Sequence, residues 1–353
     1  PHNMSSGCPL IIGDVLVTIT SNGVDEGHIN IPSPDAPSLI ALDKNTGKLL
    51  WKDSSPGKNI MHGQWAPLSY AADPVPQVIV GQGDGWLRAF DPTTGRLLWQ
   101  FDCNPKGAFY ELGGTGTKSD FIAAPVVHEG RVYIGTGQDP EHMTGIARFW
   151  CIDLKRAVEN GARRPDRDVS PDLFVQNVRV FGLRTPCTRP NPGSAEAWHY
   201  GSEDNRPFAV RDFTFGRTLS SACVVDGVVY AAELQGFLHC LDARTGKRFW
   251  TYDTKSSIWG APYYVDGKVL LATDNGDLFV FRHDPRPETI DEDEVGPVET
   301  QKEARQVRWR KRREVEQKYL MTKIEFDSMI RSTPTVAGGV LYIATENTLY
   351  AIR

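Results

Sequence analysis

The chain has 353 residues, and its 39 lysine and arginine residues against 44 aspartate and glutamate residues give a net charge of −5. This length accommodates one large β domain or two ordinary ones, and the mild acidity gives no general indication of nucleic-acid binding. No apolar run approaches the length that spans a bilayer, and no secretory signal peptide is visible. Because the first residue is not methionine, we expect a processed or partial chain.

The cysteines and the turn-forming residues narrow the class of protein further. The 33 glycine and 24 proline residues favour many turns and therefore many short strands. The six cysteines include no CxxC or CxxCH motif and no adjacent pair, which argues against a zinc ribbon and covalent haem. Buried free thiols are the simplest interpretation, with one or two disulfides near Cys187 as the alternative.

Three stretches of thirteen residues repeat one pattern along the chain: LIALDKNTGKLLW (39–51), LRAFDPTTGRLLW (87–99) and LHCLDARTGKRFW (238–250). Each has alternating apolar residues, an aspartate, a turn that ends in Thr-Gly, and then a tryptophan. The pattern predicts a β-hairpin in which the aspartate caps the turn and the glycine adopts a positive φ. The tryptophan is expected to pack between neighbouring sheets.

A second hairpin signature precedes these stretches, as in APVVHEGRVYIGTG from Ala124 and TPTVAGGVLYIATENT from Thr333. The two hairpins together form a four-stranded unit, and such units start near Cys8, Ala66, Ala124, Ala222, Ala261 and Thr333. Six repeated four-stranded antiparallel units predict an all-β protein, a single β-propeller domain over residues 1–353.

The last unit stops before its fourth strand, and open sheet edges are a liability. We therefore expect an N-terminal segment before Pro1, or another chain, to close the propeller. Seven or eight blades are predicted for the complete ring.

Two excursions interrupt the repeats. One covers residues 155–197 in the third blade, and the other covers residues 285–322 in the fifth blade. The second begins acidic and becomes basic, with helix formers throughout its basic half. A solvated surface helix is the simplest interpretation, and a docking surface for an acidic partner is the alternative. Nucleic acid is not expected, because the adjacent acidic run cancels most of the positive charge.

The hairpins and the strings HGQWAP, FDCNPK and GQDPEHMTG resemble the PQQ-like propeller repeats of quinoprotein alcohol dehydrogenases and of the β-barrel assembly lipoprotein BamB. They look like an uncharacterised subgroup of that family, and the resemblance implies an exported protein, periplasmic or extracellular. It covers nearly the whole chain except the two excursions. The hairpin motif is specific for the fold and says little about function.

The resemblance also indicates what a quinoprotein enzyme would need. Those dehydrogenases use a vicinal disulfide beside the quinone, a carboxylate and an asparagine for calcium, and an aspartate as base. This chain has no adjacent cysteines, and DKNTG (43–47) matches only the start of a calcium loop. No cofactor and no metal are therefore expected; PQQ with calcium belongs only to the enzyme alternative.

The second hairpin signature contains a proline near its start, such as Pro125 and Pro334. In several units, polar residues recur at fixed distances before this proline or before the residue that takes its place. Because these distances differ by two residues, side chains on an extended chain would face one way and line a ligand-binding mouth. A solvated channel lining is the alternative. The candidates lie seven residues before it (His2, Lys118), five before (His62, Asp120, Arg217) and three before (Gln64, Trp259, Arg331).

The loop GQDPEHMTG adds four candidates on the same open face of the propeller: Gln138, Asp139, Glu141 and His142. An aspartate, a glutamate and a histidine together could bind a metal, and a polar loop without a ligand is the preferred interpretation. No HExxH motif and no GxSxG elbow is present.

Three functions follow, in order of preference. The first is a non-catalytic binding or scaffold module for a protein partner or small ligand on the open face. The second is a PQQ-dependent oxidoreductase. The third is a polysaccharide hydrolase or lyase that uses Asp120, His62 or Asp139 as acid–base groups.

Overall fold

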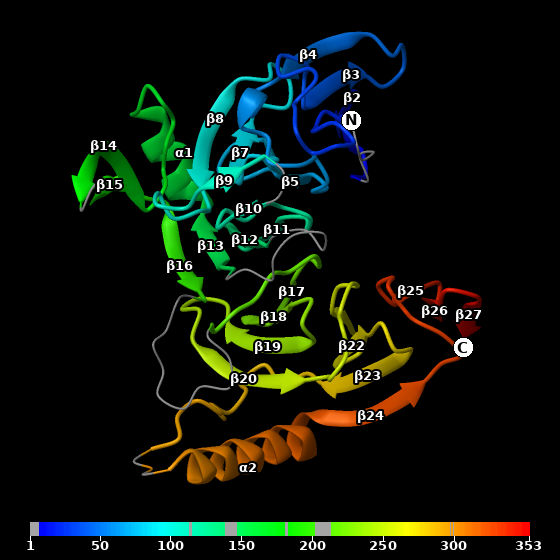
Figure 1. Cartoon of the computed structure of the whole chain (residues 1–353). Helices are drawn as coiled ribbons and strands as arrows, with labels where there is room; N and C mark the ends of the chain where they lie inside the picture. The colour runs from blue at the N-terminus through cyan, green and yellow to red at the C-terminus, as the bar shows by residue number, and fades with distance from the viewer. Residues whose placement is uncertain are drawn as a thin grey trace. The chain divides into compact units, whose positions relative to one another are not determined.

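The repeats fold into successive antiparallel sheets in a computed structural model of the chain (Figure 1). The structure describes residues 7–112, 115–137, 147–180, 183–201, 213–296, 298 and 300–353. These residues form five four-stranded sheets and a final three-stranded sheet, each with its strands in chain order. The all-β propeller architecture with four-stranded blades is confirmed, whereas the total number of blades stays a prediction. The chain divides into two compact units, Pro1–His199 and Tyr200–Arg353, which are described separately.

Unit 1 contains three blades. The first consists of β1 (Leu10–Ile12), β2 (Val15–Ile19), β3 (Leu39–Asp43) and β4 (Leu49–Asp53). The second consists of β5 (Ser69–Ala71), β6 (Gln77–Gly81), β7 (Trp86–Phe90) and β8 (Leu97–Asp102). The third consists of β11 (Val126–His128), β12 (Arg131–Gly135), β13 (Phe149–Asp153) and β16 (Glu196–Tyr200).

The connections of unit 1 add short elements to these blades. A 3₁₀ turn, η1 (Gly57–Asn59), and a small sheet of β9 (Tyr110–Glu111) and β10 (Thr115–Gly116) lie between blades. The predicted excursion of residues 155–197 contains α1 (Leu154–Ala162) and a hairpin of β14 (Asp172–Val180) and β15 (Leu183–Pro190).

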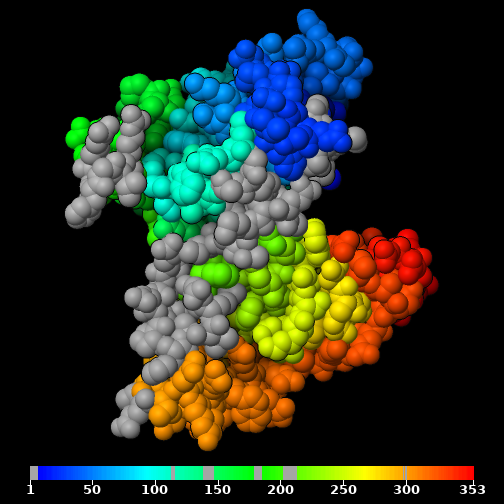
Figure 2. Space-filling model, in the orientation of Figure 1, coloured from blue at the N-terminus to red at the C-terminus, as the bar shows by residue number. Residues whose placement is uncertain are grey.

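Unit 2 contains the other three sheets. They are β17 (Cys223–Val225), β18 (Val228–Ala232), β19 (Phe237–Asp242) and β20 (Arg248–Asp253); then β21 (Tyr263–Val265), β22 (Lys268–Ala272), β23 (Asp277–Arg282) and β24 (Leu320–Glu325); then β25 (Thr335–Ala337), β26 (Val340–Ala344) and β27 (Leu349–Ile352). The excursion of residues 285–322 contains α2 (Gln301–Tyr319), which contacts β20 and β24 and lies at the surface of the unit, in orange in Figure 2. That the whole chain is one domain stays a prediction.

The repeated Thr-Gly turns have the predicted geometry. In the first turn, Asp43 Oδ1 accepts hydrogen bonds from the backbone N–H groups of Asn45 and Thr46, at 3.0 and 2.8 Å. The hydrogen bonds from Thr46 lower the pKa of Asp43. The three turn glycines have positive φ angles of 73°, 70° and 72° at Gly47, Gly95 and Gly246.

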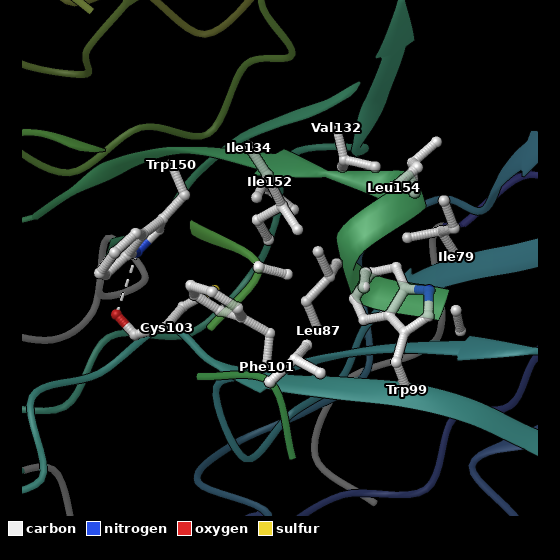
Figure 3. Close-up of a cluster of buried hydrophobic side chains, with 14 of the residues drawn as sticks. Ile79, Leu87, Trp99, Phe101, Cys103, Val132, Ile134, Trp150, Ile152 and Leu154 are labelled. Atoms are coloured by element: carbon white, nitrogen blue, oxygen red, sulfur yellow. Dashed lines mark hydrogen bonds between the residues drawn. The ribbon is translucent and has the colours of Figure 1, made fainter. Parts of the chain in front are cut away.

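Tryptophans fill the space between blades, as the repeat predicts. Figure 3 shows Trp99 of β8 and Leu154 of α1 in one cluster, which combines the second and third blades. The indole N–H of Trp99 donates to Gln77 Oε1 at 2.8 Å, and that of Trp150 donates to the Cys103 carbonyl at 3.1 Å. Both rings are buried. The Trp150 bond joins the third blade to the end of the second, whereas the Trp99 bond lies within the second blade, so apolar contact and one satisfied polar group hold these two blades together.

Alanine variants at two equivalent turn glycines, Gly95 and Gly47, are expected to differ in stability. A Cβ atom at Gly95 would lie 2.7 Å from the ring of Trp51, whereas one at Gly47 would meet nothing within 4 Å. The φ angles at the two positions are nearly equal, at 70° and 73°. An alanine therefore causes about the same backbone strain at either position, and this strain cancels in the comparison. We expect Gly95→Ala to lower the free energy of unfolding by about 1 to 3 kcal/mol more than Gly47→Ala, measured by urea denaturation. Equal losses would show that Trp51 moves aside without cost.

All six cysteines are free thiols in the structure, as the simpler interpretation expected, but only Cys103, Cys151 and Cys240 are buried. Burial raises the pKa of the Cys151 thiol to about 12, so this group stays protonated at neutral pH. In the described part of the chain, no helix has the length and apolar composition that a bilayer crossing requires.

Candidate binding face

Strand order gives each unit two sides. Successive strands of a blade are antiparallel, so alternate turns lie at opposite ends. The Thr-Gly turns lie at one end. The connections that lead into each blade, and the turns between its second and third strands, lie at the other end, which we call the open face of each unit. Its described residues are 20–38, 54–68, 82–85, 103–112 and 115–125 in unit 1, and 213–222, 233–236, 254–262, 273–276, 326–334 and 345–348 in unit 2.

His62 holds the loop of residues 20–38 on the open face of unit 1. Its side chain is buried, with 4% of the residue exposed. The ring centroid lies 4.6 Å from that of His28, within the loop of residues 20–38, and 4.8 Å from that of Trp65. The His62 carbonyl also accepts a hydrogen bond from the backbone N–H of Val24 at 2.8 Å. The residue therefore joins this loop to the connection between the first two blades.

Gln64 joins the same connection to the turn between β6 and β7. Its Oε1 accepts a hydrogen bond from the Gly83 backbone N–H at 3.1 Å, and the Gly83 carbonyl accepts one from Met61 at 2.8 Å. A Cβ atom at Gly83 would lie 2.3 Å from the Gly63 carbonyl oxygen, so this close approach requires glycine. The buried Gln64 Nε2 has no hydrogen-bond partner among the residues that the structure describes.

Asp120 anchors the start of the next loop. Its backbone N–H donates to the Gly137 carbonyl at 2.8 Å, and its carbonyl accepts from the Gly137 N–H at 3.1 Å. Its side-chain Oδ1 accepts a hydrogen bond from the Phe121 N–H at 2.7 Å. Lys118 is half-buried, and its backbone N–H donates to the Phe109 carbonyl at 3.1 Å. The other candidates of unit 1 lie outside the described residues: His2, Gln138, Asp139, Glu141 and His142.

In unit 2 the structure brings Trp259 and Arg331 together. The Arg331 guanidinium lies 5.1 Å from the centroid of the Trp259 ring, and its Nε is 2.7 Å from Asp274 Oδ1. The Arg331 side chain is 54% exposed, so this group is accessible. Arg217, by contrast, is 9% exposed, and its carbonyl accepts a hydrogen bond from the backbone N–H of Leu234 at 2.9 Å.

Sequence reasoning missed a fully buried polar network below the open face of unit 2. Glu233 Oε1 lies 2.6 Å from His239 Nε2, and Glu233 Oε2 accepts from the Gly216 N–H at 2.8 Å. His239 Nδ1 is 3.1 Å from the hydroxyl oxygen of Tyr200. Arg248 donates to that hydroxyl at 3.2 Å, so the network extends from the open-face turn to the outermost strand of the blade.

A second missed pair lies at the equivalent place in the second blade. Arg88 donates to both carboxylate oxygens of Asp84, at 2.9 and 2.7 Å, and to Gln82 Oε1 at 2.7 Å. Both charged groups are about 95% buried. A signal was available, because the corresponding position of the third strand holds arginine or histidine in only two of the six repeats; the series is Ile40, Arg88, Trp150, His239, Phe279 and Tyr350.

Buried, hydrogen-bonded residues hold the described loops of the open face in place. The residues described by the structure contain no cluster of three or more His, Cys, Asp or Glu side chains able to hold a metal ion. A cavity of about 270 Å³ lies elsewhere in unit 1, beside a Thr-Gly turn and α1. Its lining, which includes Pro92, Leu98 and Ala162, contains none of the predicted site residues.

Comparison with known proteins finds an alcohol dehydrogenase subunit and a hydroxylase among the curated relatives of this chain. The dehydrogenase subunit of alcohol dehydrogenase (quinone) from Gluconobacter oxydans (strain 621H) is 24% identical over 67% of this chain and 33% of its own length. Lupanine 17-hydroxylase [cytochrome c] from Pseudomonas sp is 23% identical over 70% of this chain and 38% of its own. This chain therefore spans about a third of the length of these curated relatives.

Solved structures show the same fold. The crystal structure of BamB from Moraxella catarrhalis aligns with a TM-score of 0.51 and 13% identity, over 97% of this chain and 67% of that one. The computationally designed Ika8 protein aligns with a TM-score of 0.50 and 11% identity, over 99% and 70%. Residues 14–182 and 190–285 match the family model described as outer membrane protein assembly factor BamB. Because these segments cover most of the chain, the protein belongs to this family of PQQ-like β-propellers.

Proposed function

We propose that the protein is a non-catalytic binding propeller that holds a protein partner or a small ligand on its open face, in an exported compartment. The observation that supports this most is burial. His62, Asp120 and Arg217 are 4%, 5% and 9% exposed, and their backbones hold connections and turns together. A group that acts on a substrate must lie within hydrogen-bond reach of it, so these three residues are better suited to support the face than to react.

The accessible groups of the face favour a protein partner. Trp259, Arg331 and Asp274 place an aromatic ring and an exposed guanidinium side by side, and both residue types are enriched in protein interfaces. The family description, an assembly factor, supports the same proposal. Export and the expectation of no cofactor rest on the family resemblance and are part of this proposal.

The curated relatives favour a second candidate, an oxidoreductase that uses PQQ with calcium. The residues of this chain do not fit that group. None of the six cysteines is adjacent to another, and the buried Asn104 uses both ends of its amide on the Ser119 backbone, at 2.8 and 2.7 Å. We therefore assign no step of a quinone reaction to this chain. Of the three acid–base candidates for a polysaccharide hydrolase or lyase, Asp120 and His62 are buried, and Asp139 lies outside the described residues.

Site-specific cross-linking in the source cells tests the proposal. A photoreactive amino acid would replace Asn275, which is exposed on the open-face turn between β22 and β23. The matched control replaces Lys247, which is exposed on the Thr-Gly turn at the other end of unit 2. We expect one adduct of defined mass from position 275 and none from position 247, because only the open face is proposed to contact the partner.

Two results would contradict the proposal. Equal adducts from both positions would show that the open face has no preferred partner. A stoichiometric quinone and calcium, released from protein purified from its source and detected by absorbance and metal analysis, would favour the oxidoreductase.

A further inference from the structure

Helix α2 has two charged faces that differ in what they contact. Its inner face packs on β20 and β24 through Val315 and Tyr319, which are 2% and 1% exposed. The cations on this side are matched by the acidic run that precedes the helix. The contacts are Arg308 with Asp293, Arg312 with Glu292, Lys318 with Glu288, and Lys311 with the carbonyls of Asp291 and Glu294.

The outer face keeps its positive charge. Its cations are Lys302, Arg305, Arg310 and Arg313; all four are exposed, and none forms an ion pair within the described part of the chain. Glu303 closes the capping box at Thr300, and Glu314 is the other carboxylate on this side. The expectation that the acidic run cancels the basic run is therefore wrong for this face, because the acidic side chains are used on the inner face.

Trp309 lies in the middle of these cations. It is 62% exposed, and the Arg313 guanidinium lies 5.7 Å from the centroid of its ring. Residues 302, 305, 309 and 313 recur every three or four positions, so their side chains form one stripe along the helix. An exposed tryptophan surrounded by arginines has the composition of an interface hot spot.

The stripe fits an acidic peptide better than a membrane or a nucleic acid. An interfacial helix inserts a whole apolar face, but the other apolar residues of α2 lie mainly against the sheets. Nucleic-acid binding commonly uses about six to ten phosphate contacts, and this face offers four cations. Three of the four are arginines, whose guanidinium groups bind carboxylates through two parallel hydrogen bonds.

The dimensions also match a short segment. Arg305 and Arg313 lie eight residues apart, which is about 12 Å along a helix axis. An extended chain covers that distance in about four residues, with alternate side chains on one side.

We propose that the outer face of α2 binds an extended, carboxylate-rich segment of a partner protein, with Trp309 as the central contact and Arg305, Arg310 and Arg313 as carboxylate ligands. This site is separate from the open face, and it does not depend on the function proposed there.

Fluorescence anisotropy with the full chain tests this site. The probe is a labelled ten-residue peptide of alternating glutamate and serine, and the same peptide with lysine in place of glutamate is the control ligand. We expect Arg305→Gln/Arg313→Gln to weaken binding of the glutamate peptide at least tenfold, and Trp309→Ala at least fivefold. Lys247→Gln, which removes an exposed cation from a Thr-Gly turn, should leave the affinity unchanged.

The variants change only exposed side chains, so circular dichroism and thermal unfolding should match those of the parent protein. Equal affinity of the parent and the α2 variants for the glutamate peptide, or no binding by the parent, would overturn the proposal. Tighter binding to a DNA duplex or to phosphatidylglycerol vesicles, lost in the same variants, would assign the face to another class of partner. Cross-linking from position 275 should persist in the α2 variants, which distinguishes failure here from failure of the open-face proposal.

Discussion

Replacing Arg88 with methionine is expected to lower the free energy of unfolding by about 3 to 5 kcal/mol, the usual cost of breaking a buried ion pair from one side. The guanidinium contacts both oxygens of Asp84, and both residues are about 95% buried. Methionine fills part of the space, but it leaves the Asp84 carboxylate and Gln82 Oε1 without their donor. Urea denaturation at neutral pH measures the loss.

A double variant separates the charge from the packing. Arg88→Met/Asp84→Asn removes the buried charge while the new amide can still accept the Trp86 N–H, which bonds to Asp84 Oδ1 at 3.3 Å. We expect the double variant to be more stable than Arg88→Met alone by about 1 to 3 kcal/mol. Arg96→Met, at an exposed arginine of the same blade, should change stability by less than about 0.5 kcal/mol. A double variant no more stable than Arg88→Met would attribute the loss to packing.

The hairpins could be predicted from sequence because their signals are local. The aspartate, the turn glycine and the alternating apolar residues all act within about ten residues, as at Asp43 and Gly47. The spacing of these signals then located six sheets, since every blade repeats the same order of turns. The helix over 301–319 was also readable from its composition, although its capping box at Thr300 and Glu303 was overlooked.

The candidate site was harder to predict because it depends on contacts between distant segments. The offset rule located His62, Asp120 and Arg217 on connections of the open face, but it could not show that neighbouring loops bury them. Burial of His62 depends on the loop of residues 20–38, which is remote in sequence. The network of Glu233 and His239 was missed for the opposite reason, because both residues lie at or beside strands that the repeat pattern treats as architecture.

The charge of α2 illustrates the same limit. Summing the charges of residues 285–322 predicted near neutrality, and the sum is a fair description of the segment as a whole. The helix separates these charges, because residues such as Arg308 and Arg312 turn inward to the acidic run while Arg305 and Arg313 turn outward. A one-dimensional charge count cannot register which face a side chain occupies.

Trp250 gives the second large expected effect, since it is fully buried at the centre of the unit 2 core. Its ring stacks on Tyr319 of α2 at 5.0 Å and lies 6.1 Å from the ring of Tyr230. Trp250→Ala should lower the free energy of unfolding by about 3 to 5 kcal/mol, because it leaves a large cavity and loosens the end of α2. Guanidinium denaturation followed by far-UV circular dichroism measures this loss.

Phenylalanine variants separate the ring from its polar group. The buried indole N–H of Trp250 has no partner among the described residues, whereas that of Trp99 donates to the buried Gln77 side chain. Trp250→Phe should therefore lose only contact area, while Trp99→Phe also leaves Gln77 Oε1 unsatisfied at an added cost of about 1 to 3 kcal/mol. A smaller loss for Trp99→Phe than for Trp250→Phe would contradict this assignment, because it would mean that the repeated tryptophans stabilise the blades by packing alone.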